Sequence, residues 1–252
     1  WGPLEPFDNS FPELLRENGI YTHLITDHYH YWEDGGGTYH NRFNSYEFVR
    51  GQENDAWKAM VDPPWERFKQ MYHPIQYAES WEGKYSHYMV NREYIKEEED
   101  FTSYQCFDLG LEFLNENKNA DNWFLQLETF DPHEPFFTQE EFQKLYPHEY
   151  DGPPFDWPPY REVREDDQTV EHIRYMYASL ITFCDQQLGR VLDAFDEHDL
   201  WKDTMLLVNT DHGLLMGEHD WWAKVVTPFF QEIAHIPFWA YDPRNSNEIN
   251  KK

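Results

Sequence analysis

The sequence predicts an α/β fold with a mostly parallel central sheet and helices on both faces of that sheet. Two observations lead to this prediction. Short apolar runs typical of strands alternate with longer segments of helical periodicity, and polar clusters follow the strands. Because parallel strands need long crossover connections, the intervening helices are expected to cover the sheet.

The first helix and strand are predicted near the start of the chain. A short helix is expected over residues 11–18, with Ser10 as its N-cap, Pro12 in its first turn and Gly19 after its end. The apolar run over residues 20–26 that follows is typical of a strand.

The later elements follow from the same patterns. The clearest is a helix in which apolar residues recur at three- and four-residue steps from Ile173 to Phe195. The others, in chain order, are a loop over 33–57, a helix over 101–117, a strand over 123–127, a Pro-rich loop over 152–159, and strands over 205–209 and 236–241.

Composition excludes several classes of protein. The chain has 20 basic and 48 acidic side chains and a net charge of −28, so it is not expected to bind nucleic acid or an anionic membrane surface. No apolar run is long enough to span a bilayer. Two cysteines are too few for a disulfide framework, and an aromatic content of 19% indicates a folded chain.

Polar clusters follow three of the predicted strands, at residues 27–30, 131–133 and 210–213. In parallel sheets, ligands bind at the carboxyl ends of the strands. The oxygen of Asp211 and the imidazole of His212 are suited to a divalent cation. An Asp at the end of a strand is more often a turn former or a helix cap, so the tripeptide Asp-His-Gly alone does not establish a metal site.

The spacing of these clusters resembles the sulfatase family of the alkaline-phosphatase superfamily. Residues 210–213 (T-D-H-G), 217–219 (G-E-H) and Lys224 follow one another as in that family. Residues 130–135 resemble its D-P-H-x-P loop, and residues 20–57 resemble a bacterial branch of the family. The resemblance extends in order over residues 10–244.

The resemblance implies a role for each motif. Asp211 and His212 would bind a divalent cation, Ca²⁺ or Mg²⁺ first and Mn²⁺ or Zn²⁺ as alternatives, together with acidic residues nearer the N-terminus. Lys224 would neutralise a sulfate oxygen, and His133 would act as proton donor or hydrogen-bond partner to the leaving group. The alternatives are a surface lysine and a loop histidine without a role.

Further candidates lie around these residues. Many sulfatases carry Lys-x-His where this chain has His28 and His30, so His30 is a candidate catalytic residue and His28 a substrate-binding one that replaces a lysine. Arg42 and His219 are further candidates for substrate binding, with bracing of its own loop as the alternative for His219. The aromatic residues that could stack on a sugar ring, or simply pack in the core or at its rim, are Trp32, Trp221 and Trp222.

The family's nucleophile is a formylglycine made within a C/S-x-P-x-R motif, which this sequence lacks. Ser10-Phe11-Pro12 begins the motif, but Leu14 stands in place of the arginine. We therefore expect residues 1–252 to be the middle and C-terminal part of a sulfatase-like catalytic domain. The nucleophile-bearing N-terminal part and the C-terminal subdomain would be absent, which leaves the fold incomplete at both ends and the chain inactive alone.

The function predicted on this basis is hydrolysis of small anionic sulfate esters, with sulfated sugars among the candidates. One alternative is a phosphodiesterase or phosphonate monoester hydrolase of the same superfamily, since His28 replaces a lysine. The other is a noncatalytic remnant that binds anions or glycans. The sequence leaves the oligomeric state and the cellular location open, cytoplasmic and periplasmic alike.

Overall fold

The computed structural model describes residues 2–77 and 86–245. Its strands are β1 (Tyr21–Thr26), β2 (Ser45–Phe48), β3 (Trp123–Glu128), β4 (Leu206–Asn209), β5 (Leu215–Met216), β6 (Trp222–Ala223) and β7 (Phe238–Tyr241). Its α-helices are α1 (Phe11–Glu17), α2 (Trp65–Met71), α3 (Ser86–Arg92), α4 (Thr102–Asn117), α5 (Glu140–Gln143), α6 (Asp167–Glu197) and α7 (Gln231–Ala234).

A parallel sheet with helices on both faces forms the centre, which confirms the predicted fold class. Its strand order is β2-β1-β3, and β1 pairs in parallel with both neighbours. Successive side chains of a strand point to opposite faces. On β3, Leu125 and Leu127 pack in one apolar cluster with Cys106 of α4, whereas the Phe124 ring meets Phe11 of α1 at 5.2 Å.

The prediction of loop over residues 33–57 was wrong at one place, because β2 lies within that range. Its four residues are too few to show the alternation that identifies a strand in a sequence. Backbone pairing with β1, from His23 opposite Ser45 to Thr26 opposite Phe48, holds them extended. The edge position of β2 therefore depends on a tertiary contact.

The strand predicted over 205–209 does not extend the parallel sheet in the described part of the chain. It forms β4, which pairs antiparallel with β7 in a separate two-stranded sheet. The apolar sequence of this pair predicted burial, yet Leu207 is 50% exposed and Trp239 is 63% exposed. An apolar run identifies a strand but specifies neither its partner nor its direction.

The long predicted helix is confirmed as α6, which begins earlier than its apolar stripe. The Asp166 side chain caps it by accepting the Thr169 N–H at 2.9 Å, so polar first turns precede the stripe. Leu180 and Phe183 are fully buried in the main core, whereas Ile181 is 42% exposed. The helix therefore buries one face and leaves the other in solvent.

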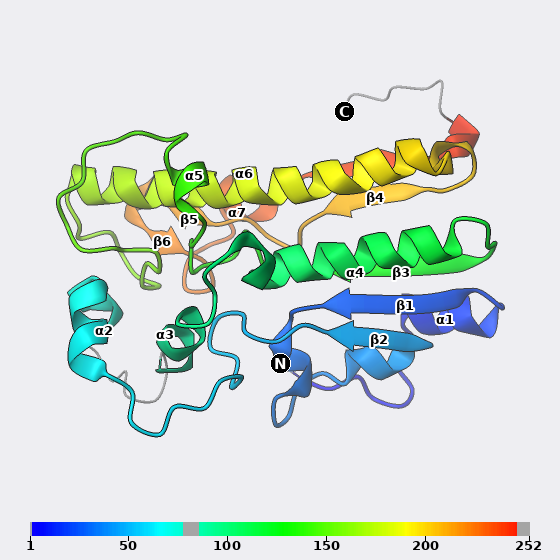
Figure 1. Cartoon of the computed structure of the whole chain (residues 1–252), viewed down its shortest axis with the longest axis horizontal. Helices are drawn as coiled ribbons and strands as arrows, with labels where there is room; N and C mark the ends of the chain where they lie inside the picture. Colours follow the sequence, from blue (N-terminus) through cyan, green and yellow to red (C-terminus); the bar gives the residue numbers. More distant parts are fainter. Residues whose placement is uncertain (1, 78–85, 246–252) are drawn as a thin grey trace.

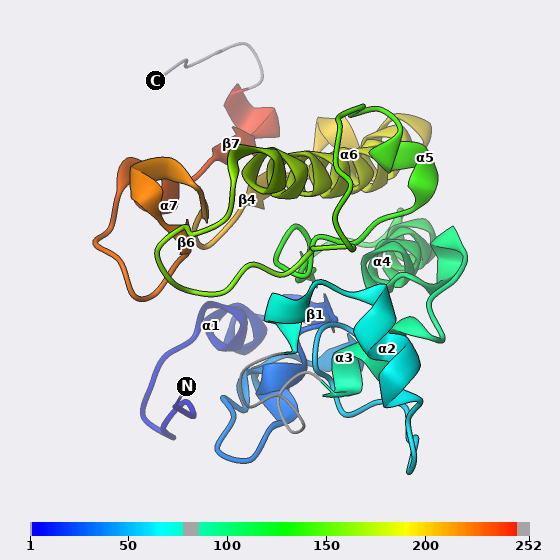
Figure 2. The ribbon, with the colours of Figure 1, turned by 90° about the vertical axis from the view of Figure 1, so that its left-hand side faces the viewer.

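The arrangement brings the ends of distant strands to one side of the molecule. In Figure 1 the arrowheads of β1, β2 and β4 point in the same direction, and α6 runs along the top above α4. Figure 2, turned by 90°, shows α4 beneath α6 and beside β1. The loops that carry the predicted site residues therefore leave the strands at a common end.

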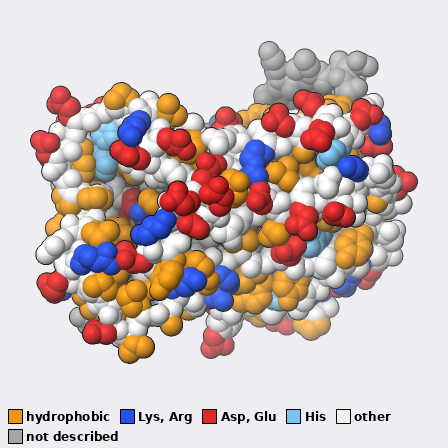
Figure 3. Space-filling view, in the orientation of Figure 1, with side chains coloured by type: hydrophobic (Ala, Val, Ile, Leu, Met, Phe, Trp, Pro, Cys, Tyr) orange, Lys and Arg blue, Asp and Glu red, His pale blue; other side chains and the backbone are white. Residues whose placement is uncertain are grey.

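The surface agrees with the acidic composition. Acidic side chains are spread over the face shown in Figure 3, in keeping with the net charge of −28. Within residues 2–77 and 86–245, no helix has the length and apolar character needed to span a membrane.

We predict that Gly110 sets the distance between α4 and β3. A Cβ added there would overlap Leu127 Cδ1, whereas a Cβ at Gly189 of α6 would meet nothing within 4 Å. Gly110→Val should therefore lower the free energy of unfolding by about 1–3 kcal/mol through overpacking. The matched Gly189→Val should change it by less than about 0.5 kcal/mol. Urea denaturation of both variants tests this, and equal effects would contradict it.

Candidate functional site

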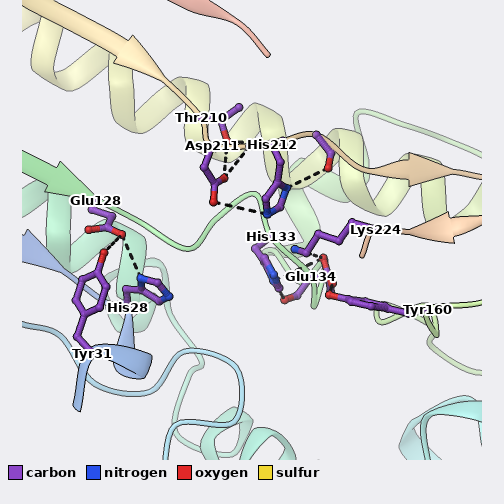
Figure 4. Close-up of polar contacts among 11 residues, drawn as sticks. His28, Tyr31, Glu128, His133, Glu134, Tyr160, Thr210, Asp211, His212 and Lys224 are labelled. Atoms are coloured by element: carbon purple, nitrogen blue, oxygen red, sulfur yellow. Dashed lines mark hydrogen bonds and ion pairs between the residues drawn. The ribbon is translucent and has the colours of Figure 1, made fainter. Parts of the chain in front are cut away.

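Residues from three distant segments meet at the common end of the strands. The Phe130 ring links two of these segments, because its centroid lies 4.8 Å from that of His28 and 5.0 Å from that of His133. Figure 4 shows the third segment, which contributes Asp211 and His212, beside His133. We call the following residues the site cluster: His28, Tyr31, Glu128, His133, Glu134, Tyr160, Asp211, His212 and Lys224.

Two buried carboxyl groups hold the loop that carries His133. Asp27, directly after β1, accepts hydrogen bonds from the Phe130 N–H at 2.7 Å and from the Thr102 hydroxyl at 2.7 Å. Asp131, in the loop itself, accepts from Ser103 at 2.5 Å and from Gln52 at 2.9 Å. The ends of β1 and β3 are thereby tied to the first turn of α4, which fixes the loop on which His133 stands.

Burial perturbs both carboxyl groups in the same direction. Burial, and after it the neighbouring Asp131, raises the pKa of Asp27 to about 8 against the effect of its hydrogen bonds. Burial likewise raises the pKa of Asp131 to about 6. The folded state therefore favours the protonated form of Asp27 at neutral pH, where it supports the loop without adding negative charge.

Lys224 and Glu134 form the deepest part of the site. Glu134 is fully buried and the Lys224 side chain is 9% exposed, with Nζ 3.8 Å from Glu134 Oε2. That separation exceeds a hydrogen bond, and in the described part of the chain neither atom has a hydrogen-bond partner. Tyr160 donates a hydrogen bond to the other Glu134 oxygen. A buried ammonium without an acceptor is suited to bind an anionic oxygen from a ligand.

Lys224, His133 and Glu134 shift one another's pKa values. Burial lowers the pKa of Lys224, and Glu134 and Asp211 offset part of that effect. Burial also lowers the pKa of His133, which Glu134 opposes. For Glu134, burial works toward a higher pKa, but the charges of His133 and Lys224 outweigh it and lower the pKa. Glu134 therefore opposes the lowering of the pKa of both Lys224 and His133.

Asp211 and His212 lie beside this point but not at its bottom. The Asp211 side chain is 81% exposed and that of His212 is 34% exposed, so both are shallower than Lys224 and Glu134. The reason is that β4, which they follow, belongs to the exposed pair. Asp211 Oδ1 accepts the His212 N–H at 2.9 Å, as in a turn.

Asp211 and His212 show whether the residues of this chain could hold a divalent cation. Asp211 Oδ2 and His212 Nε2 lie 3.6 Å apart and offer two donors. No cluster of three or more His, Cys, Asp or Glu side chains suited to a metal occurs within residues 2–77 and 86–245. Two donors fall short of the six to eight oxygens that calcium takes. The residues described here do not complete a metal site.

Of the two histidines after β1, His28 lies across the site cluster from Lys224 in Figure 4, whereas His30 Nε2 lies 3.9 Å from Glu53 Oε2. His28 Nδ1 is 3.2 Å from Glu128 Oε1, and that oxygen also accepts the Tyr31 hydroxyl at 2.7 Å. His30 stands next to His28, with ring centroids 5.4 Å apart, and its Nδ1 lies 2.5 Å from Glu33. Both histidines are thus held against carboxylates.

Two candidates for substrate binding have their described contacts elsewhere. Arg42 pairs with Glu13 of α1 at 2.6 Å and donates to the Glu5 carbonyl at 2.9 Å. His219 lies 3.2 Å from Glu232 and stacks on Phe230, which agrees with bracing of its own loop.

The aromatic candidates are also held by other contacts. Trp222 is fully buried and donates to Glu165 at 2.8 Å, so it is a core residue that a sugar cannot reach. The Trp32 ring stacks on Phe48 at 3.9 Å and on His40 at 4.5 Å.

Sequence reasoning missed the carboxylates of the site. Glu134 stood within the D-P-H-x-P motif but at its variable position, so the motif drew no attention to it. Glu128 is the last residue of β3, where a glutamate in an apolar strand was a signal that could have found it. Glu53 lies near the site only because of the tertiary fold, and its charge interacts with those of Lys224 and Glu134. Burial raises the pKa of Glu53 to about 7.

The fold is that of an α/β protein, with the site cluster beside the carboxyl ends of β1, β3 and β4. The sequence model of the Sulfatase family matches residues 2–251. The chain therefore belongs to the sulfatase family.

Curated relatives are sulfatases. Human iduronate 2-sulfatase is 32% identical over 167 residues, which are 55% of this chain and 30% of that protein. Mouse iduronate 2-sulfatase is 25% identical over 265 residues, 93% of this chain and 45% of that protein. An arylsulfatase of Clostridium perfringens is 26% identical over 217 residues, 68% of this chain and 44% of that protein. The chain thus spans less than half the length of these relatives.

Solved structures share the fold. The phosphonate monoester hydrolase of Agrobacterium radiobacter is 15% identical, with a TM-score of 0.62 over 97% of this chain and 54% of that chain. A protein in complex with its substrate D-glucosamine-2-N,6-O-disulfate is 13% identical, with a TM-score of 0.58 over 96% of this chain and 57% of that chain. At these identities the likeness establishes the architecture.

We predict that Asp27 makes stability depend on pH. Its folded-state pKa of about 8 lies above the value near 4 of an unfolded aspartate. Its contribution to stability is therefore complete below about pH 4 and is lost as the pH rises through about 8, by at most about 1.4 kcal/mol per pH unit.

Asp27→Asn can keep both hydrogen bonds and removes this titration. Between about pH 5 and pH 8, urea denaturation should show a smaller loss of stability for this variant than for the unmodified chain. Asp62→Asn, at an exposed position, is the matched control and should follow the unmodified chain. A variant as pH-sensitive as the unmodified chain would contradict the role of Asp27.

We also predict that Glu134→Gln lowers the pKa of both Lys224 and His133, because the charge of Glu134 raises both. NMR titration of lysine and histidine side-chain carbons measures the two values. Glu66→Gln, which alters a side chain that is 88% exposed on α2, should leave them unchanged. A rise in either pKa in Glu134→Gln would be inconsistent with the proposed electrostatics.

Proposed function

We propose that the protein containing this chain hydrolyses sulfate esters. The observation that carries the proposal is the buried Lys224 ammonium, which lacks a hydrogen-bond acceptor in the described part of the chain and lies beside Glu134. It stands in a member of the sulfatase family, at the position where the resemblance requires a group that neutralises sulfate. A preorganised charge of this kind stabilises the charge that develops in the transition state.

His133 is proposed to act on the leaving group. Its Nδ1 lies 2.6 Å from the Glu134 carbonyl oxygen, so the Nδ1–H donates a hydrogen bond to the backbone and Nε2 is left as the nitrogen that can act on the leaving group. Nε2 can donate a proton only when the ring is doubly protonated. Because burial lowers the pKa of His133, proton donation is favoured at acidic pH, and the rate should fall as the pH rises through that pKa.

The remaining chemistry is proposed to come from residues outside 1–252. Both cysteines of this chain are unsuitable nucleophiles, since burial raises the pKa of Cys106 and of Cys184. A formylglycine from a C/S-x-P-x-R motif would supply the nucleophile. Ca²⁺ or Mg²⁺ would supply Lewis-acid activation, with Asp211 and His212 as two of its ligands and further acidic residues completing the set.

Hydrolysis of phosphonate monoesters or phosphodiesters is the alternative. One observation favours it: His28, in the position of a family lysine, is paired with Glu128 and provides no permanent cation. Sulfate and phosphate esters are both tetrahedral anions, so a site that binds one accepts the other more weakly. Sulfated sugars are the proposed substrates because relatives include iduronate 2-sulfatases.

The test compares kcat/KM for an aryl sulfate, an aryl phosphate diester and an aryl phosphonate on the whole polypeptide encoded with this chain. We expect the sulfate to be preferred, and Lys224→Met to lower its kcat/KM by roughly 100- to 1,000-fold. Lys69→Met, on α2 and 43% exposed, should have no effect. A higher kcat/KM for either phosphorus ester would contradict the assignment, and no hydrolysis at all would indicate a binding protein.

A further inference from the structure

Glu128 places a carboxylate, which repels anions, at the outer part of a site that is proposed to act on anionic esters. It is the last residue of β3, and its side chain is 27% exposed. Tyr31, His28 and Gln126 all direct polar groups at it, the last at 3.3 Å from Oε2. These contacts hold the carboxylate in one orientation at the edge of the site.

The exposure of the side chains in the site cluster rises from one end of the cluster to the other. Lys224 and Glu134 are at the buried end, where the side chains are 9% and 0% exposed. Glu128, whose side chain is 27% exposed, lies across the site cluster from them in Figure 4, beside His28 and Tyr31. For an ester whose sulfate binds at Lys224 and His133, we place the alcohol part at this open end, beside Glu128.

The charge in that outer region is negative. A carboxylate accepts hydrogen bonds and cannot donate them. The groups that complement Glu128 are hydroxyl and ammonium groups, whereas a second carboxylate would meet repulsion without a compensating hydrogen bond.

We propose that Glu128 determines substrate specificity, so that the preferred substrates are sulfate esters of neutral or amino sugars and not of uronic acids. This inference rests on the proposed sulfatase function. It distinguishes the chain from the iduronate 2-sulfatases among its relatives, because iduronate carries a carboxylate. Two facing carboxylates in a half-buried site repel strongly enough to reduce kcat/KM about tenfold or more.

The experiment measures kcat/KM on the whole polypeptide for pairs of sulfated pyranosides that differ only at C6. One member of each pair is a glucoside with a hydroxymethyl group, the other a glucuronide with a carboxylate, and the pairs carry sulfate at C2, C3 or C4. The glucoside should be preferred by about tenfold or more. The ratio within a pair does not depend on how much of a preparation is folded.

Three variants test whether the charge of Glu128 causes the preference for the glucoside. Glu128→Gln should bring the ratio about tenfold closer to one. Tyr31→Phe removes a contact but keeps the charge and should retain the preference, as should Glu140→Gln, which alters a side chain that is 79% exposed on α5.

Each other outcome overturns a distinct claim. A preference for glucuronides, an unchanged ratio in Glu128→Gln, or hydrolysis of an aryl sulfate but of no sugar sulfate would overturn the specificity proposal. Failure to cleave the aryl sulfate as well would instead refute the sulfatase function on which it rests.

Discussion

The site depends on a buried carboxylate and a buried ammonium that do not quite touch. Glu134 and Lys224 lie 3.8 Å apart with almost no solvent contact. Burying either charge alone would be costly, so each requires the other. Their separation leaves the ammonium with donors to spare, and the same pair influences the ionisation of His133. Stability and anion binding are therefore linked in one interaction.

That pair is useful only because other contacts hold its surroundings in place. Asp27 and Asp131 connect the ends of β1 and β3 to Thr102 and Ser103 at the start of α4. Since burial raises the pKa of both carboxyl groups, they serve as hydrogen-bonding anchors with reduced charge. At neutral pH, Asp27 is mainly protonated and therefore adds no negative charge beneath the site.

At the exposed edge of the site cluster, the charged side chains are carboxylates. Glu128 and Asp211 are more exposed than Glu134, and on our proposal Glu128 lies beside the alcohol part of a bound ester. The permanent cation of the site cluster is at its buried end, and carboxylates are at its edge. This arrangement separates recognition of the sulfate, which is common to the family, from selection of the group that carries it.

The sequence by itself determined the elements whose signals are local, and with them the family. Apolar patterns identified α6 and the strands β1, β3, β4 and β7, and the spacing of short motifs pointed to His133, Asp211 and Lys224. Only the tertiary structure decided what depends on partners: the pairing of β4 with β7, the strand β2, and the depth of each side chain. It also decided that Lys224 rather than Asp211 is buried, and it brought Glu134 and Glu128 into the site. The reason is physical, since burial and charge coupling arise between segments about 80 to 100 residues apart, and no local pattern of residues encodes that distance.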